Sequence, residues 1–305
     1  FIDGLKPWDI SRDAPYFGFR IPGYEDKYFY VWLDAPIGYI ASLENYLKKE
    51  NIDKDSKALW GEQSDAEIYH FIGKDIMNFH TLFWPCMLET AGFKKPNNVF
   101  VHGFMTLNGK KMSKSKKNFL LVDDYLQVLQ PDLIRYYLAS KLSSGVDDLD
   151  MDIKDFQKKV NTDLVGKFIN IASRSQGFLK KDNNKLSEIL DNEIIEEFVK
   201  EKENIFNLFL ARDYSKAVKE IMLLADKANQ YIDSKKPWEL VKEEANSMEV
   251  KKIASTAINL FRILNLYLEP VIPETSERIK NYLQSNHSLD ELSEHLTNHE
   301  LEKFK

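Results

Sequence analysis

The sequence predicts an α/β region followed by an all-α region, and three observations carry this prediction. Residues 1–105 alternate between short apolar runs and helical stretches, the order typical of a parallel sheet. Apolar side chains recur at helical spacing from residue 153 to residue 284. The chain has 305 residues, 43% of them hydrophobic, which is enough for about two domains with sizeable cores.

Three strands and the helices between them are expected in the first region. Residues 28–33 are continuously apolar or aromatic, as in a strand buried on both faces. A helical pattern follows, and then a second short apolar run over residues 67–72. Residues 75–90 have helical periodicity, with Gly92 as a stop signal. Residues 98–105 form the third expected strand, and right-handed crossovers make the sheet parallel.

A transition over residues 106–150 leads into the helical region. It contains a lysine-rich loop, a short helix near residues 122–129 and a helix opened by Pro131. The acidic stretch 147–150 is expected to mark a boundary, and the polar tail after Ser285 is expected to fray.

The second region is predicted to be a helix bundle, because its apolar side chains form stripes at helical spacing. The stripes are Val160, Leu164, Phe168 and Ile171; Ile205, Phe206, Leu208 and Phe209; and Ile253, Ile258, Phe261 and Leu264.

Charge and cysteine content exclude several classes of protein. The net charge of −6 excludes a globally cationic surface, so any nucleic-acid contact requires a local patch. The single cysteine, Cys86, cannot form an internal disulfide or a cysteine-rich zinc site, and this fits a reducing compartment. No apolar run is long enough for a transmembrane helix, and there is no signal-peptide pattern.

The densest local signal is the segment 110–117, in which five of eight residues are lysines and two are serines. Lysine side chains are mobile point charges suited to a polyphosphate whose charge moves during a reaction. The segment lacks the glycines of a Walker loop. A solvated basic loop or a localisation patch explains the composition equally well.

Within this segment, residues 111–115 spell Lys-Met-Ser-Lys-Ser, identical to the KMSKS signature of class I aminoacyl-tRNA synthetases. Four further blocks occur in the order and spacing of one branch of that class. Over about residues 1–280 the chain closely resembles bacterial methionyl-tRNA synthetases. The four blocks are 8–18, 31–39, 70–80 and 101–104.

The resemblance implies three parts. They are the C-terminal half of the class I catalytic Rossmann fold (1–104), the KMSKS loop with a stem-contact region (105–155), and a helix-bundle anticodon-binding domain (156–305). The His-x-Gly-His signature of the class is absent from this sequence, as are the cysteines of the family's zinc-bearing insertion. We therefore expect the N-terminal half of the catalytic domain to lie upstream of Phe1, and this chain alone to be inactive.

The activity implied by the resemblance is ligation of methionine to its tRNA in the cytoplasm. L-Methionine is activated by ATP, with Mg²⁺, to methionyl-adenylate and transferred to tRNA(Met), with release of AMP and pyrophosphate. No zinc and no membrane partner are expected. The implied catalytic groups are Lys111 and Lys114, because charge builds on the departing pyrophosphate and a preorganised ammonium stabilises it.

The implied ATP site centres on the turn Gly73-Lys74-Asp75. Gly73 allows the backbone to approach the ribose, and the Asp75 carboxylate can accept from both ribose hydroxyls. Asp75 fits a helix N-cap equally well. The full implied set is Gly73, Asp75, His102, Gly103, Met105, Lys111 and Lys114.

The implied methionine pocket is aromatic and soft, as a thioether requires. A Tyr39 hydroxyl and a His80 ring N–H are candidates to recognise the sulfur, and Ile76 shares a helix face with His80. Without the resemblance, the plainer interpretation of these side chains is that they are ordinary core residues. The implied pocket set is Trp8, Trp32, Ala35, Pro36, Tyr39, Ile76 and His80, and the implied mobile aromatic layer is Trp8, Phe79, Phe83 and Trp84.

The resemblance also implies that Asn170, Arg174 and Trp238 hold the anticodon. Asn170 and Arg174 are four residues apart and share a helix face away from the apolar stripe, so they are expected to be exposed. A Trp platform for stacking, with Asn and Arg to contact base edges, suits unpaired RNA. For Trp238 alone, a core position after Pro237 is the plainer interpretation.

Two other classes of function remain open from sequence. One is a tRNA-binding module without catalysis, or one part of a split synthetase. The other is a synthetase for leucine or isoleucine, although residues 32–39 and the anticodon trio favour methionine.

Overall fold

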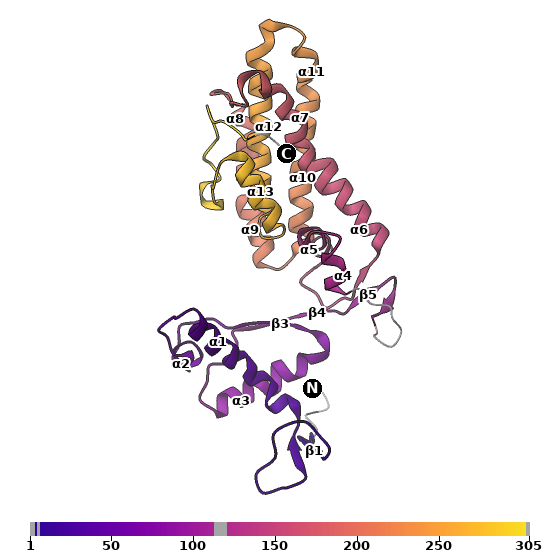
Figure 1. Ribbon diagram of the computed structural model, residues 1–305, viewed down its shortest axis with the longest axis vertical. Coiled ribbons are helices and arrows are strands. Elements are labelled where there is room, and N and C mark those ends of the chain that lie inside the picture. The colour runs from indigo at the N-terminus through magenta and orange to yellow at the C-terminus, as the bar shows by residue number, and fades with distance from the viewer. Residues whose placement is uncertain (1–3, 5–6, 113–120, 303–305) are drawn as a thin grey trace. The chain divides into compact units, whose positions relative to one another are not determined.

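The computed structural model describes residues 4, 7–112 and 121–302, with only the backbone described for Lys111. The chain divides into two compact units, Phe1–Gly103 and Phe104–Lys305. Figure 1 traces the elements of both units. None of the described helices is long and apolar enough to cross a membrane.

The first unit contains a small parallel sheet with helices between its strands. Strands β3 (Tyr69–Gly73) and β4 (Asn98–His102) pair in parallel, with Tyr69 opposite Asn98 and Gly73 opposite His102. This confirms the predicted α/β class. The remaining elements are β1 (Ser11–Asp13), β2 (Lys27–Phe29), η1 (Val31–Leu33), η2 (Ala35–Ile37), α1 (Gly38–Lys49), α2 (Ser56–Trp60), η3 (Lys74–Ile76), η4 (Phe79–Phe83) and α3 (Trp84–Thr90).

The prediction of a strand over residues 28–33, buried on both faces, was wrong in its length and in its burial. Only its start belongs to β2, which pairs antiparallel with β1. Residues Val31–Leu33 form a 3₁₀ turn instead, because the amides of Leu33 and Asp34 bond back to the carbonyls of Tyr30 and Val31. Val31 is 43% exposed, so this apolar run is not buried on both faces.

The helix expected over residues 75–90 has three different geometries. It begins as the 3₁₀ turn η3, widens into the π-helix η4, and continues as α3. Pro85 has no N–H to donate to the preceding turn, and the Trp84 amide bonds to the Phe79 carbonyl, five residues back. Gly92, with φ of +72°, lies just beyond the helix as expected.

The second unit begins with a three-stranded sheet, in which β5 lies between β7 and β6 (Lys110–Lys111). The expected third strand over 98–105 ends at His102, and Met105–Leu107 is a separate strand, β5. The acidic stretch 147–150 is not a linker, since Leu149–Met151 is strand β7, parallel to β5. Asp150 Oδ1 accepts from Thr106 Oγ1 at 2.6 Å and from the Gly109 amide at 2.7 Å, so these acids organise the sheet.

Helices form the rest of this unit, which confirms the predicted all-α region. The central helix α12 is buried almost throughout, and the rings of Phe168 and Phe261 meet across the core at 4.7 Å. The elements are β6 (Lys110–Lys111), α4 (Val122–Leu126), α5 (Pro131–Ala139), α6 (Ile153–Lys159), η5 (Val160–Ile169), α7 (Asn170–Leu179), η6 (Lys180–Asp182), α8 (Asn192–Lys200), α9 (Lys202–Leu210), α10 (Tyr214–Lys235), α11 (Pro237–Leu240), η7 (Glu244–Asn246), α12 (Ser247–Leu268), α13 (Pro273–Leu283) and η8 (Leu289–Glu291).

The three predicted apolar stripes differ in how completely they are buried. The first and third are buried in full, as predicted. In the second stripe Ile205 is buried, but Phe206 is exposed, because α9 is covered on one side only.

The tail after Ser285 is packed, contrary to the expectation that it frays. Leu292, Leu296 and Leu301 are buried in the main core. The Asn259 side chain on α12 donates to the Leu296 carbonyl at 3.0 Å and accepts from the Leu296 amide at 2.8 Å. Leucines spaced along a polar segment thus attach it to α12.

Candidate functional site

Aromatic side chains of the first unit gather around Phe79 on η4. Trp32 stacks on Phe79, with ring centres 4.3 Å apart and planes 4° from parallel. Trp8 meets Tyr30 and Phe83 edge to face, at 5.1 and 5.0 Å. The structure therefore brings together aromatic residues that lie far apart in the sequence, in an arrangement suited to an apolar ligand.

His80 and Tyr39 form the polar centre of this aromatic group. His80 is fully buried; its Nε2 lies 2.8 Å from the Tyr39 hydroxyl and its Nδ1 lies 3.0 Å from the Ile76 carbonyl. A carbonyl can only accept, so Nδ1 carries the proton and, in the neutral ring, Nε2 accepts from Tyr39. Both expected sulfur donors are therefore used within the protein, and a ligand must displace one of these bonds to receive either. Of the other expected pocket residues, Pro36 is buried.

His70 is a member of this group that the sequence analysis did not include. It is buried on β3, where its Nε2 accepts from the Trp84 indole N–H at 3.2 Å. Its ring lies 5.4 Å from that of His80 and 4.8 Å from that of Tyr39. Burial, together with the neighbouring His80, lowers the pKa of His70, and burial raises the pKa of Tyr39. The only sequence signal for His70 was its place at the start of the 70–80 block.

Trp84 differs from the rest of the expected aromatic layer. It is 2% exposed and packs with Trp60 and Leu88 in the small core of this unit. It also reaches the aromatic group from this core, through its bond to His70, whereas Trp8, Phe79 and Phe83 contact one another directly.

The expected ribose-binding turn has a close approach at its glycine. A Cβ on Gly73 would lie 2.7 Å from Asp75 Oδ1 and 3.9 Å from the His102 ring, so a side chain at this position would displace the Asp75 carboxylate. Asp75 lies within η3, whose N-cap is Gly73, so the alternative in which Asp75 is an N-cap was wrong. His102 Nδ1 donates to the Gly103 carbonyl at 2.8 Å. The structure thus brings Gly73, Asp75 and His102 together at the ends of two parallel strands.

Gly103 ends the first unit, and the other expected ATP residues, Met105, Lys111 and Lys114, belong to the second unit. Met105 is 41% exposed on β5, and the backbone of Lys111 pairs with Thr106 in β6. Lys114 and the rest of residues 113–120 lie outside the described residues.

The three residues expected at the anticodon lie together on the helix bundle. The Arg174 guanidinium lies over the Trp238 ring, 5.4 Å from its centre. Asn170 is one turn away from Arg174 on α7, and Trp238 is in the first turn of α11, after Pro237. Trp238 is 40% exposed, so it is not a core residue. Asn170 and Arg174 are half-buried rather than freely exposed.

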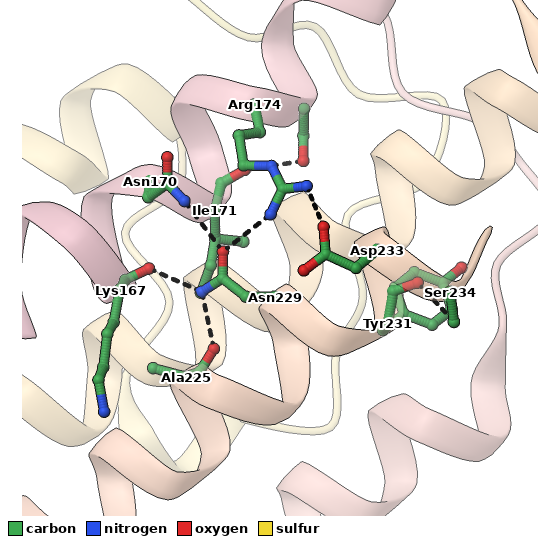
Figure 2. Close-up of polar contacts among 10 residues, drawn as sticks. Lys167, Asn170, Ile171, Arg174, Ala225, Asn229, Tyr231, Asp233 and Ser234 are labelled. Atoms are coloured by element: carbon green, nitrogen blue, oxygen red, sulfur yellow. Dashed lines mark hydrogen bonds and ion pairs between the residues drawn. The ribbon is translucent and has the colours of Figure 1, made fainter. Parts of the chain in front are cut away.

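Two residues of α10 hold Asn170 and Arg174 in place, and the sequence analysis missed both. Asn229 Oδ1 accepts from Asn170 Nδ2 at 3.2 Å and from Arg174 Nη1 at 3.5 Å, and Asp233 pairs with Arg174 Nη2. Figure 2 shows both side chains of α7 directed at α10. Asn229 and Asp233 are four residues apart, but their pattern in the sequence is that of any amphipathic helix.

Metal ligands do not cluster anywhere in the described part of the chain. There, no group of three or more His, Cys, Asp or Glu side chains could hold a metal ion. Cys86 is exposed and unpaired with any other cysteine.

Two family models match the chain. Residues 1–176 match the tRNA synthetases class I (M), and residues 183–301 match the anticodon binding domain of methionyl tRNA ligase. The chain therefore belongs to the class I tRNA synthetases. Within that class its family is that of the methionyl-tRNA synthetases.

Solved structures of this family share the fold. Two structures of Mycobacterium tuberculosis methionyl-tRNA synthetase with methionyl-adenylate are each 27% identical to the chain. They align with TM-scores of 0.83 and 0.82 and cover 100% and 99% of it. The apo form of that enzyme is 25% identical, with a TM-score of 0.76 over 96% of the chain. The chain spans 58–60% of the length of these proteins.

Proposed function

We propose that this chain acts in the ATP-dependent ligation of L-methionine to tRNA(Met), and that its bundle recognises the anticodon. The observation that carries this is the convergence of Asn170, Arg174 and Trp238, from two separate helices, at one partly exposed place. A ring available for stacking beside amide and guanidinium donors is the chemistry that unpaired bases require.

The reaction proceeds in two steps. The methionine carboxylate attacks the α-phosphorus of ATP, which enters with Mg²⁺ on its phosphates, and pyrophosphate leaves. The adenylate then passes methionine to the terminal ribose of tRNA(Met), releasing AMP. We assign charge stabilisation in the first step to Lys111 and Lys114.

The substrate sites follow the groups described above. We assign the ribose and base of ATP to Gly73, Asp75, His102, Gly103 and Met105. The methionine side chain is assigned to the aromatic group around Phe79, whose soft, apolar walls suit a thioether. We also propose the division into 1–104, 105–155 and 156–305 and a cytoplasmic place of action; the break between Gly103 and Phe104 supports the first boundary.

Anticodon recognition is tested by binding labelled tRNA(Met) to the 305-residue chain. The comparison is with the same tRNA carrying a replaced anticodon. We expect the wild-type chain to prefer the natural anticodon, and Trp238→Ala to lose about tenfold in affinity for it, because a stacked base contributes about 1–3 kcal/mol. Leu210→Ala, which truncates an exposed apolar side chain on α9, is the matched control. A wild-type chain indifferent to the anticodon would contradict the proposal.

Catalysis by the chain alone is a separate question. Since the sequence contains no His-x-Gly-His motif and spans about 60% of its solved relatives, we expect residues 1–305 alone to form no methionyl-adenylate. Methionine-dependent exchange of pyrophosphate into ATP measures this directly. Substantial exchange would show that these residues suffice, and would leave a pure binding module without support.

A further inference from the structure

A second feature of the bundle is a cavity of about 370 Å³ between η5 and the N-terminal half of α10. Its lining is unusually rich in lysine for a protein with a net charge of −6. The charged residues that line it are Lys159, Asp163, Lys167, Lys216, Lys219 and Asp226.

Two of the lysines are held by the two aspartates of the lining. Lys159 Nζ lies 2.9 Å from Asp163 Oδ2, and Lys167 Nζ lies 2.7 Å from Asp226 Oδ2. Asp163 is fixed in turn by the buried Tyr136 hydroxyl, which donates to it at 2.8 Å. These pairs order the walls of the cavity and neutralise one another.

The other two lysines are held by neither lining aspartate, and of these two Lys219 adds the positive charge that no described carboxylate offsets. Lys216 is 68% exposed and pairs at 2.5 Å with Asp213, which does not line the cavity. Lys219 is exposed, and in the part of the chain that the structure describes it has no ion-pair partner. Ser215 and Lys216, in the first turn of α10, also line the cavity. The Asp213 carboxylate before this turn accepts from the Ser215 hydroxyl at 3.4 Å, so this helix end already carries an anion of its own.

Lys167 links the cavity to the residues that hold the anticodon trio. Its side chain lines the cavity, while its carbonyl accepts from Asn229 Nδ2 at 3.0 Å. Asn229 is the residue that holds Asn170 and Arg174, as Figure 2 shows. The helical path from Arg174 to Lys159, which includes the π-helix η5, has a length on the order of 20 Å, and this is several nucleotides of RNA.

We propose that this cavity binds backbone phosphates of the RNA strand that continues from the bases held at Trp238. The proposal rests on the proposed function and extends it to a second contact on the same two helices. Mobile ammonium groups suit phosphates because they follow the backbone without selecting a base. The contact therefore adds affinity and salt dependence, and leaves anticodon choice to the trio.

The test compares two double variants of the 305-residue chain. Lys216→Gln with Lys219→Gln removes the two lysines that no lining carboxylate holds. Lys181→Gln with Lys200→Gln makes the same change in charge at exposed lysines that do not line the cavity. Circular dichroism and the thermal midpoint establish that both variants are folded.

Binding of tRNA(Met), with its natural or a replaced anticodon, is then measured over a series of KCl concentrations. We expect the cavity variant to lose about three- to tenfold in affinity for both RNAs alike. The slope of log Kd against log[KCl] should fall by about 1 to 2, as for one or two lost phosphate contacts. The control variant should change neither quantity by as much.

The outcomes separate this proposal from the proposed function. If the two double variants behave alike while the wild-type chain prefers the natural anticodon and Trp238→Ala loses about tenfold in affinity for it, the phosphate contact is wrong and anticodon recognition stands. If inorganic phosphate raises the thermal midpoint of the wild type but not of the cavity variant, and RNA affinity is unchanged, the cavity holds a free anion and the proposal is overturned. If the wild-type chain shows no anticodon preference, the proposed function itself fails.

Discussion

At the scale of single residues, His80 shows how a buried polar group is fixed by its partners. Both ring nitrogens are bonded, one to the Ile76 carbonyl and one to the Tyr39 hydroxyl. In an interior that is otherwise aromatic, an unpaired ring nitrogen would cost about 1–3 kcal/mol. Tyr39 therefore determines the orientation of His80 within the proposed methionine pocket.

Tyr39→Phe tests this positioning. It removes the hydroxyl and keeps the ring, so we expect the Kd for methionine to rise about three- to tenfold, the value of one hydrogen bond of about 1 kcal/mol. The measurement is quenching of tryptophan fluorescence by methionine, with leucine as the non-cognate ligand. Tyr46→Phe, on an exposed ring of α1, is the control. Equal methionine affinity in the Tyr39 variant and the wild type would contradict the role given to the hydroxyl.

His295 carries a prediction about pH. Its burial lowers the pKa below the ordinary value of 6.5, the nearby Arg262 guanidinium lowers it further, and Glu196 opposes them. Between the two pKa values the unfolded chain binds the proton first, so the free energy of unfolding decreases as pH falls below about 6.5. We expect the thermal midpoint, followed by far-UV circular dichroism, to fall between about pH 7 and pH 5.5.

The same experiment on His295→Gln supplies the comparison. Gln cannot take up a proton, so its thermal midpoint should depend less on pH in this window than that of the wild type. His70 has a lowered pKa as well, but it belongs to the first unit and is present in both proteins. The difference between the two proteins therefore reports His295. An unchanged pH dependence in the Gln variant would show that His295 does not titrate as described.

The candidate site was predictable from sequence to the extent that its residues form contiguous blocks. Gly73, Asp75 and His80 lie in one such block, and Asn170 and Arg174 lie on one helix. Their supporting residues were not predictable, because Asn229 and Asp233 contact the trio only after α10 packs beside α7. A polar residue every third or fourth position is what any solvated helix face would show.

At the scale of elements, helices were predicted better than strands. The helical stripe from Val160 to Ile171 is buried as expected. Apolar residues at helical spacing identify the buried face of a helix from its own sequence, without knowledge of its neighbours. Residues 28–33 misled because an aromatic run can pack against other aromatic side chains, as Trp32 does on Phe79, as readily as it fills a sheet. Hydrophobic content alone does not distinguish these two surroundings.

The segment after α13 gives the clearest element-scale prediction. Leu292 is 1% exposed in the main core, and the Arg262 guanidinium donates to its carbonyl at 2.7 Å. We expect Leu292→Ala to lower the free energy of unfolding by about 2–4 kcal/mol, through lost burial and the cavity left behind. Urea unfolding followed by far-UV circular dichroism measures it.

Leu210→Ala provides the matched control for this substitution, since Leu210 is 63% exposed on α9. Its free energy of unfolding should stay within about 0.5 kcal/mol of the wild type. A Leu292 variant as stable as this control would mean that the C-terminal segment frays after all, as its polar composition suggested.

At the scale of the whole molecule, the two units differ in the size of their cores. The buried apolar cluster of the first unit is Trp60, Trp84 and Leu88 with a few partly buried neighbours, and Leu47 and Ile72 are buried outside it. The second unit has a continuous core that runs from α4 to the C-terminal segment. Since stability grows with the apolar area buried, the first unit should have the smaller free energy of unfolding.

The positions of the five tryptophans allow the difference in free energy of unfolding between the two units to be measured. Trp8, Trp32, Trp60 and Trp84 belong to the first unit, and Trp238 alone belongs to the second. We expect tryptophan fluorescence to change at a lower urea concentration than far-UV circular dichroism, which is dominated by the bundle helices. Non-coincident transitions are the signature of unfolding in more than one step. Trp238→Phe confines the fluorescence to the first unit and should sharpen the separation, whereas coincident midpoints in that variant would show that the two units unfold as one.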